Sequence, residues 1–535
     1  MCGFVAYVNP RLTIESAQNM FEMGKRRGPD DSCFHVVNSN FWVGFHRLAI
    51  NGLQDVRANQ PLSLGSLLLV CNGEIYNSKE LYRQMGVTPY SESDCEVILH
   101  LFERYGIEQT VNMIDASEFA FVLYDTSLNH VYAVRDPYGV RPLYTAKHKD
   151  MVMFGSELKS ISYPNTVYNS VQPGSIVMFE NGEWSTKIYH SLPCINWGLG
   201  TDVISLIQKV FYDAVMKRVK NTERPIACLL SGGLDSSIVT ALVVQCRRKL
   251  GYTDRLETYS IGMEGGEDLH YANVVADHLG TKHTTVINDE DGFFDAIPEV
   301  IYRIESYDTT SVRASVGNYL VAQYISKNSE AKVIFNGDGA DEVAGGYLYF
   351  RAAPDALAAD GECRRLMNDI HCFDALRSDR CIASNGLEAR TPFLDRVFVQ
   401  MYMSIPPEIR FANGVQEKQL LRTAFGHLLP PKVATRTKEA FSDGVSSLKR
   451  SWFQIVQEKI PLEIRNEFKN YQWARKHWYN TPTTAEQYYY RHLYNVHYMD
   501  AATTIPYFWM PRFVAAHDAS ARTLTGIYKS QTVNH

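Results

Sequence analysis

Cys2 directly follows the initiator methionine, so removing one residue would make it the N-terminus. Such a cysteine carries a thiol and a free α-amine, and an amine with a pKa of about 8 can act as the base for its own side chain. Two other interpretations compete with this nucleophile. A buried structural cysteine is the default for the residue type, and a lipidation site lacks a myristoylation pattern or polybasic stretch. Position alone does not decide.

The following residues supply groups that could serve a nucleophile. An apolar strand over 67–70 runs into Asn72-Gly73-Glu74, where an amide side chain and a following N–H can converge on one oxyanion. Arg47 stands at the edge of another apolar strand. Asp94 opens an apolar-periodic helix, which makes it an N-cap candidate. Each feature alone is weak, since Asn-Gly is usually a turn and a strand-edge arginine is usually solvated.

A glycine-rich loop suited to anions lies in the second half of the chain. The pattern predicts a buried strand over 226–230, a small-residue loop over 231–237, and a helix from Ser236 or Ser237. Gly232 and Gly233 let backbone N–H groups approach an anion, and the helix N-terminus adds positive potential. The loop lacks the GxxxxGK[ST] pattern, so it is not a Walker A loop.

Three carboxylates crowd into five residues after a predicted strand over 331–335: Asp338, Asp341 and Glu342. Beside a phosphate loop, such crowding suits Mg²⁺, which prefers oxygen ligands shared with phosphates. The alternative is a solvated acidic turn, which the surrounding glycines make less attractive.

Strands and helices alternate around these loops. The pattern predicts a strand over 256–262, a helix over 267–280 and a strand over 283–288. This alternation indicates a parallel, doubly wound sheet, in which ligands bind at the carboxyl ends of the strands. A Pro-, Gly- and Asn-rich stretch over 190–202 marks the preceding domain break, and a helical pattern follows it.

The composition of the chain indicates what kind of protein contains these sites. A chain of 535 residues with 45% apolar and 21% charged residues predicts more than one globular domain. Its net charge of −6 gives no reason to expect nucleic acid or a membrane as a partner. No apolar run reaches membrane-helix length, and the ten cysteines form no CxxC pair. We therefore expect a cytoplasmic protein.

Several blocks in the first half occur in a recognisable order: CGF, RGPD, RLAI, NGEIYN, SDCEV, RDPYGVRPLY and GSELKS. In this order they resemble the class II glutamine amidotransferase domain, an N-terminal-nucleophile αββα sandwich, over residues 2–190. The resemblance implies that Cys2 attacks the glutamine amide, forming a thioester, while Asn72 and the Gly73 N–H stabilise the oxyanion. It further implies that Arg47 binds the substrate α-carboxylate, and that Glu74 and Asp94 read the α-ammonium.

The second half resembles glutamine-hydrolysing asparagine synthetase, through SGGLDSS, ESYDTTSVRASVGNYL, NGDGADEVAGGY, DRCIASNGLEARTPFLD and RTKEAFSDGV. The implied fold is an ATP pyrophosphatase-type domain over 203–535 with a helical C-terminal part, after a linker over 191–202. The implied substrates are glutamine, aspartate and ATP. Aspartate would form β-aspartyl-AMP and pyrophosphate, and ammonia carried inside the protein would then give asparagine and AMP.

The resemblance assigns further residues to the second site. It implies an ATP and pyrophosphate set of Leu229, Ser231, Gly232, Gly233, Asp235, Ser236, Ile261, Asn336, Gly337, Arg380 and Lys438. It implies an aspartate set of Thr310, Ser311 and Arg313, and Mg²⁺ ligands Asp235 and Asp341. Ser311 replaces the family's usual threonine and Arg380 an expected lysine. Asp338 replaces a glutamate thought to act as a base or to position ammonia, and we expect altered efficiency rather than inactivity.

Other interpretations stay open. A β-lactam synthetase-like enzyme shares both domains but needs no ammonia, and another glutamine-dependent amidotransferase would adenylate a different carboxylate. A non-catalytic binding or storage protein would have no need of Cys2 and SGGLDSS. The aromatic-rich stretch over 450–535 is interpreted mainly as packing against the synthetase domain, with a homodimer interface as the alternative.

Overall fold

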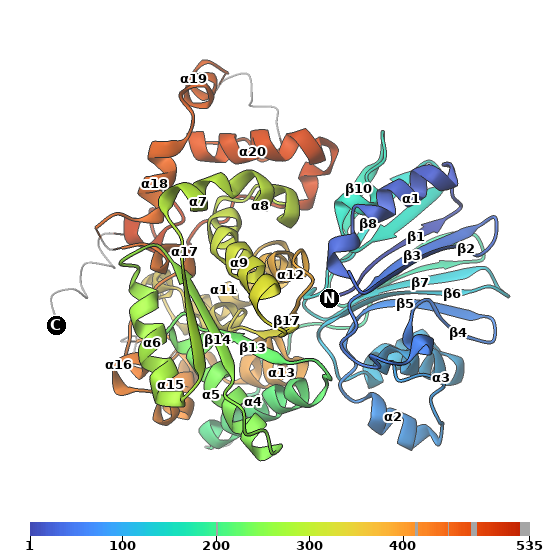
Figure 1. Cartoon of the computed structure of the whole chain (residues 1–535), viewed down its shortest axis with the longest axis horizontal. Coiled ribbons are helices and arrows are strands. Elements are labelled where there is room, and N and C mark those ends of the chain that lie inside the picture. Colours follow the sequence, from blue (N-terminus) through green and yellow to red (C-terminus); the bar gives the residue numbers. More distant parts are fainter. Residues whose placement is uncertain (199–201, 412–415, 448, 472–478, 525–535) are drawn as a thin grey trace.

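The computed structural model describes residues 1–198, 202–411, 416–447, 449–471 and 479–524. Within them the chain forms two domains, one built on antiparallel sheets and one on a parallel sheet (Figure 1). The bounds predicted for the domains stay a prediction, and residues 199–201 of the predicted linker lie outside the described residues.

Two six-stranded antiparallel sheets form the first domain. The first has the order β10-β8-β9-β1-β3-β2, with β1 Gly3–Val8, β2 Asp31–Val36, β3 Phe41–Arg47, β8 Tyr144–His148, β9 Met151–Gly155 and β10 Val167–Ser170. The second has the order β12-β11-β7-β6-β5-β4, with β4 Leu62–Leu64, β5 Leu67–Gly73, β6 Phe119–Asp125, β7 His130–Arg135, β11 Ser175–Glu180 and β12 Glu183–Ile188. Strand β1 is an interior strand of its sheet and pairs with β3 and β9. Cys2 directly precedes this strand and therefore lies next to the core of the domain.

The two sheets face each other across an apolar layer that includes Phe4 and Val43 from one and Val122 from the other. Helix α1 (Ile14–Glu22) covers the first sheet, while α2 (Ser78–Met85) and α3 (Val97–Met113) lie against the second (Figure 1). This is the predicted αββα sandwich.

The second domain is built on a parallel sheet of order β15-β14-β13-β16-β17. Its strands are β13 Ile226–Leu229, β14 Glu257–Gly262, β15 Lys282–Ile287, β16 Val333–Phe335 and β17 Glu388–Arg390. From β13 the chain moves outward to β14 and β15, then returns to the other side of β13 with β16. The order therefore reverses between β13 and β16, which is where a doubly wound sheet opens a ligand crevice.

The predicted strands and helices agree with these elements to within a few residues. Helix α5 (Leu234–Lys249) begins two residues before the predicted Ser236, because Gly233 takes the extended N-cap conformation. Gly232 has φ +73°, and a side chain there would overlap the backbone of Tyr271 and Ala272. Glycine is therefore required where the loop crosses α6.

Helices surround the sheet and form the C-terminal part (Figure 1). Beyond α5 they are α4 Val203–Lys220, α6 Glu267–Leu279, α7 Glu290–Asp295, α8 Ile297–Ile304, α9 Thr309–Asn328, α10 Ala340–Ala344, α11 Ala356–Asp369, α12 Asp374–Ala383, α13 Arg396–Ser404, α14 Pro407–Arg410, α15 Gln419–Phe425, α16 Pro431–Ala434, α17 Phe441–Gly444, α18 Trp452–Lys459, α19 Leu462–Tyr471 and α20 Ala485–Tyr498. No helix in the described ranges is both long and apolar enough to cross a bilayer.

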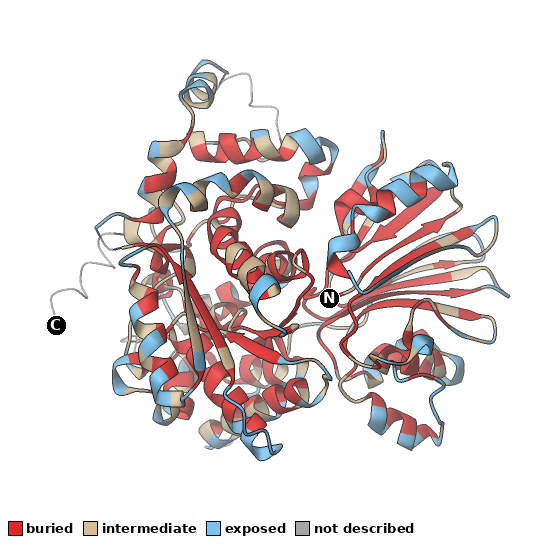
Figure 2. Cartoon of the chain, in the orientation of Figure 1, coloured by how far each residue is buried: buried red, intermediate tan, exposed pale blue. Residues whose placement is uncertain are grey.

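The described aromatic residues of the C-terminal stretch are largely buried (Figure 2). Trp452, Tyr490 and Trp509 pack in the interior of the second domain, as the packing interpretation predicts. Trp473 and Trp478, which belong to the same prediction, lie outside the described residues.

Ion pairs buried from water join the two domains. The pairs that cross the boundary include Arg27–Asp379 at 2.7 Å, Lys159–Glu305 at 2.9 Å, Arg218–Glu118 at 3.2 Å, Arg390–Glu74 at 3.3 Å and Arg380–Glu157 at 3.4 Å. Their side chains are at most 5% exposed. Because buried charges need partners, these pairs fix how one domain sits on the other.

Candidate active sites

Cys2 is partly buried and packs against the apolar cores of both domains. Its Sγ accepts the Leu48 N–H at 3.4 Å and lies 3.6 Å from the Leu48 carbonyl. Met1 is present and buried, and its α-amine donates to the Leu387 carbonyl at 3.1 Å. Burial lowers the pKa of this amine to about 6 and raises the pKa of the Cys2 thiol to about 11. The thiol is therefore a poor nucleophile while Met1 occupies this place.

An unpaired amide lies at the end of β5. Asn72 and Gly73 pair with Ala120 and Phe119 of β6, which fixes their positions. Asn72 is 1% exposed, and its Nδ2 has no hydrogen-bond partner among the described residues. A buried donor without a partner costs free energy, so its retention indicates an acceptor that arrives with a substrate. An oxyanion is such an acceptor.

Asn72→Ala is expected to lower kcat for glutamine hydrolysis on the order of 10²-fold, because one oxyanion donor is lost. The Tm should change little, since no hydrogen bond of Nδ2 is broken. Steady-state glutamate release and a thermal melt measure the two effects. A large fall in Tm with normal kcat would show that Asn72 is structural.

Arg47, Glu74 and Asp94 surround the same boundary site. Arg47 donates to Asn59 Oδ1 at 2.5 Å and to the carbonyls of Asn51 and Gly52, which leaves guanidinium donors for a ligand. Glu74 accepts from Asn51 Nδ2 at 2.9 Å.

The second domain also contacts this carboxylate. Asn221 Nδ2 donates to Glu74 at 2.6 Å, and Arg390 lies 3.3 Å away. Burial, then Glu388 and Asp94, raise the pKa of Glu74 well above its ordinary value. Burial and the neighbouring carboxylates therefore disfavour the ionised form of Glu74, and a bound ammonium group would favour it.

The prediction of Asp94 as an N-cap is wrong. It begins a 3-10 turn over Asp94–Glu96, and its Oδ2 accepts the Ile75 N–H at 2.6 Å and lies 3.5 Å from Asn221 Nδ2. The side chain turns back toward the strand end that carries Asn72 rather than capping α3. Its function in glutamine binding stays a prediction.

Acid is expected to weaken glutamine use through Asp94. Burial raises the pKa of this carboxyl to about 6, so below that pH it becomes neutral and no longer attracts an ammonium group. In the protein, kcat/KM for glutamine hydrolysis should fall about tenfold per pH unit in this range. In Asp94→Asn it should be low at pH 7 and lack this acid limb. An unchanged acid limb in Asp94→Asn would assign it to another group.

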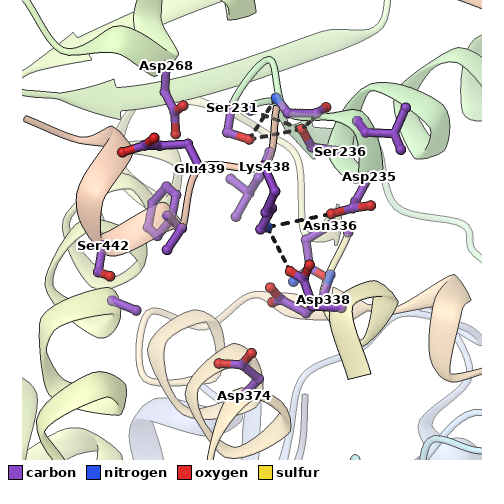
Figure 3. A pocket seen from close by; sticks show the side chains of 18 of the residues that line it. Ser231, Asp235, Ser236, Asp268, Asn336, Asp338, Asp374, Lys438, Glu439 and Ser442 are labelled. Carbon is purple, nitrogen blue, oxygen red and sulfur yellow. Dashed lines mark hydrogen bonds and ion pairs between the residues drawn. The ribbon is translucent and has the colours of Figure 1, made fainter. Parts of the chain in front are cut away.

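A second site opens at the crevice between β13 and β16. Figure 3 shows Ser231, Asp235 and Ser236 of the glycine loop facing Lys438, with Asn336 and Asp338 from the turn after β16. The cavity brings together many residues predicted from sequence: Leu229, Ser231, Gly233, Asp235, Ser236, Ile261, Thr310, Asn336, Gly337, Asp338, Asp341 and Lys438. The hydroxyls of Ser231 and Ser236 lie 3.1 Å apart and brace the loop.

Two lysines neutralise the predicted metal ligands. Lys418 Nζ lies 2.5 Å from Asp235 Oδ2 and 2.7 Å from Asp341 Oδ1, and Lys438 Nζ lies 2.7 Å from Asp341 Oδ2. Burial raises the pKa of Asp341, but the two lysines outweigh it and lower the pKa to about 2. Burial lowers the pKa of Lys438, but Asp341 and Asp235 outweigh it and raise it. Asp341 and Lys438 are therefore charged.

Arg377 and Lys418 line the cavity but were not predicted. Arg377, on α12, holds Asp338 Oδ1 at 2.9 Å, and Asp338 Oδ2 has no partner in the described chain. Arg377 lies two residues before the DRCIASNGLEARTPFLD stretch, which begins at Asp379, and three residues before Arg380. Lys418 precedes a short helix, and nothing in its local sequence distinguishes it from a surface lysine.

Two predicted cations lie elsewhere. Arg313 pairs with Glu486 at 2.5 Å and Asp518 at 2.7 Å, since α9 turns Thr310, Ala314 and Asn318 toward the cavity instead. Arg313 does not line this cavity, and its role in aspartate binding stays a prediction.

Arg380 is fully buried at the domain boundary. It donates to the Ser156 carbonyl at 2.6 Å and pairs with Glu305 at 3.0 Å, because Arg377 takes the cavity face of α12. Arg380 does not line the cavity, and its role in pyrophosphate binding stays a prediction. Ser311 lines a small pocket beside the cavity together with Thr310, while Gly232 packs on α6.

Together, the fold and the two sites define a glutamine amidotransferase domain joined to an ATP-dependent ligase domain. A model of the glutamine amidotransferase domain matches residues 1–192, and one of asparagine synthase matches residues 206–360 and 351–503. Asparagine synthetases [glutamine-hydrolyzing] of Cricetulus griseus and Homo sapiens are 40% identical over 94% of this chain and 95% of theirs. That of Gallus gallus is 41% identical with the same coverage. The chain belongs to the glutamine-hydrolysing asparagine synthetase family.

Proposed function

We propose that this chain makes asparagine from aspartate, ATP and glutamine, releasing glutamate, AMP and pyrophosphate. One observation carries the proposal. A single chain carries a cysteine and an unpaired buried amide in one domain, and a serine- and glycine-lined cavity with facing lysines in the other. The first arrangement suits amide hydrolysis, and the second suits a polyphosphate.

In the first site, Cys2 attacks the glutamine amide after Met1 is removed. The freed α-amine of Cys2 takes the thiol proton and returns it to the leaving ammonia. Asn72 Nδ2 and the Gly73 N–H hold the oxyanion, Arg47 binds the α-carboxylate, and Glu74 and Asp94 hold the α-ammonium. Water then releases glutamate from the thioester.

In the second site, the glycine loop and Lys438 bind the ATP phosphates while the strand ends at Leu229 and Ile261 frame the base. Thr310 and Ser311 line the small pocket beside the cavity, and they orient aspartate. Attack of the β-carboxylate on the α-phosphorus forms β-aspartyl-AMP and releases pyrophosphate. Asp338, held by Arg377, positions ammonia for attack on the acyl adenylate and takes its proton.

Ammonia reaches the adenylate through the interior. One continuous apolar cluster extends from Leu48, beside Cys2, to Leu230 at the end of β13. Apolar surroundings favour neutral ammonia, the nucleophilic form, over ammonium.

The cavity fits Mg²⁺ that arrives with ATP. Asp235 is 8% exposed, and its Oδ1 lacks a hydrogen-bond partner among the described residues, so it offers a carboxylate oxygen to a hard cation. No cluster of three or more His, Cys, Asp or Glu side chains in the described ranges could hold a metal ion by itself. Phosphate oxygens would complete the ligand set. When bound, Mg²⁺ supplies neutralisation of the phosphate charge.

The setting of the enzyme forms part of the same proposal. All ten cysteines are unpaired, including the exposed Cys194, which supports a reducing, cytoplasmic compartment. Glutamine, aspartate and ATP are the proposed partners, and a homodimer is compatible with the fold.

The decisive experiment measures pyrophosphate release with Mg-ATP and glutamine, with and without aspartate, and identifies the products by mass spectrometry. Pyrophosphate that depends on aspartate, with asparagine and AMP, supports the proposal. Glutamine hydrolysis without aspartate dependence would favour an amidotransferase acting on another carboxylate. Pyrophosphate formed without any need for a nitrogen donor would favour a β-lactam synthetase-like reaction.

A further inference from the structure

We propose that Lys418 is a positioning residue that holds Asp235 and Asp341 together and prevents a divalent cation from binding there without nucleotide. The inference deepens the proposed function, on which it rests. Lys418 lies directly before α15, and its side chain is 1% exposed. Its ammonium bridges two carboxylates that come from opposite sides of the crevice, one from α5 and one from α10.

The backbone and its neighbours keep this lysine in place. Lys418 has φ +58°, a left-handed conformation that residues other than glycine seldom adopt. A side chain on Gly346 would overlap both Lys418 Cε and Asp341 Oδ1, so only glycine leaves room for the ion pair. A strained backbone and a required glycine around one ammonium indicate that its position matters.

The two lysines differ in their freedom to move. The side chain of Lys438 is 21% exposed, whereas that of Lys418 is 1% exposed. Glu417 Oε1 accepts the Lys438 backbone N–H at 2.7 Å, which anchors its main chain but not its ammonium. Lys438 can therefore turn to a phosphate, while Lys418 stays on the carboxylates.

Charge then sets the order of binding. Without nucleotide, the two lysines balance Asp235 and Asp341, and both oxygens of Asp341 are occupied. A bare cation would have to displace an ammonium from a buried pair, which is costly. ATP brings phosphates that draw Lys438 away and free Asp341 Oδ2, while Asp235 Oδ1 has no hydrogen-bond partner among the described residues. The metal ligands are thus completed only when the nucleotide is present.

The test is Mn²⁺ binding to the nucleotide-free protein, followed by electron paramagnetic resonance of the free ion. Lys418→Met should lower the Kd for Mn²⁺ at least tenfold, because two carboxylates lose a counter-charge. Lys418→Gln, which is polar and close in size, should shift the Kd in the same direction if the methionine variant folds poorly. Lys432→Met, at an exposed lysine on α16, should leave the Kd unchanged.

A Kd within twofold of the unmodified protein in a folded Lys418 variant would overturn the proposal. A weaker affinity would do so too, because it would show that the Lys418 ion pairs do not compete with the cation. The measurement needs no substrate, so its outcome is independent of aspartate-dependent pyrophosphate release. If aspartate-dependent pyrophosphate release is absent while the Lys418 variants show the expected fall in the Kd for Mn²⁺, the proposed reaction is wrong but the role of Lys418 stands.

Discussion

Cys2→Ala is expected to lower glutamine hydrolysis by about 10⁴-fold or more, because the only proposed nucleophile is removed. Asparagine formation from ammonium chloride should persist, since the cavity at β13 and β16 contains no part of Cys2. Glutamate release and aspartate-dependent pyrophosphate release, measured in parallel, separate the two activities. This one substitution should therefore abolish the use of glutamine as a nitrogen source and leave the use of ammonia unchanged.

Cys194→Ala is the matched control, since Cys194 is exposed and should leave both activities unchanged. Mass spectrometry of the active protein should show a chain without Met1, because the thiol has a raised pKa while Met1 is in place. Full glutamine hydrolysis by a protein that retains Met1 would contradict the mechanism.

Asp338→Ala is expected to lower asparagine formation about 10³-fold with glutamine or ammonia, through loss of a general base. Glutamine hydrolysis and the first release of pyrophosphate should continue, because the glycine loop and Lys438 are unchanged. Quenched-flow analysis should therefore show a burst of pyrophosphate without matching asparagine. The loss includes the cost of leaving Arg377 with one carboxylate partner fewer.

Asp338→Glu tests the shorter side chain directly. It restores the residue usual in the family and should retain asparagine formation, with a changed rate. Asp277→Ala, at an exposed aspartate on α6, is the neutral control. Unchanged asparagine formation in both Asp338→Ala and Asp338→Glu would remove Asp338 from the mechanism.

Local patterns predicted the elements that carry the chemistry. The sequence around SGGLDSS predicts a strand, a glycine loop and a helix from its composition and hydrophobic period within some twenty residues. Strand β13 and helix α5 lie where this pattern predicts them. The helix start was misplaced by two residues because the N-cap is a glycine rather than a serine. Asp94 was mistaken for a cap because its partner, the Ile75 N–H, is distant in sequence.

Long-range pairing explains the other differences. Arg313 and Arg380 lie in stretches that resemble the family, yet their orientation depends on carboxylates far along the chain: Glu486 and Asp518 for one, Glu157 and Glu305 for the other. Lys418 was missed for the same reason, since Asp235 is 183 residues away. A sequence pattern supplies a charge but not the direction in which its helix face points.

The buried ion pairs across the domain boundary also limit modularity. If the two domains were separated, water would solvate the charges of Arg27, Lys159 and Arg218. Each domain alone would then contain no buried unpaired charge from these pairs and could keep its fold. Exchange with the glutaminase half of a distant relative is a harder case. Every mismatched position would bury one charge without a partner, at about 3–5 kcal/mol each. Recombination of such domains should therefore succeed only when both faces of the boundary are transplanted together.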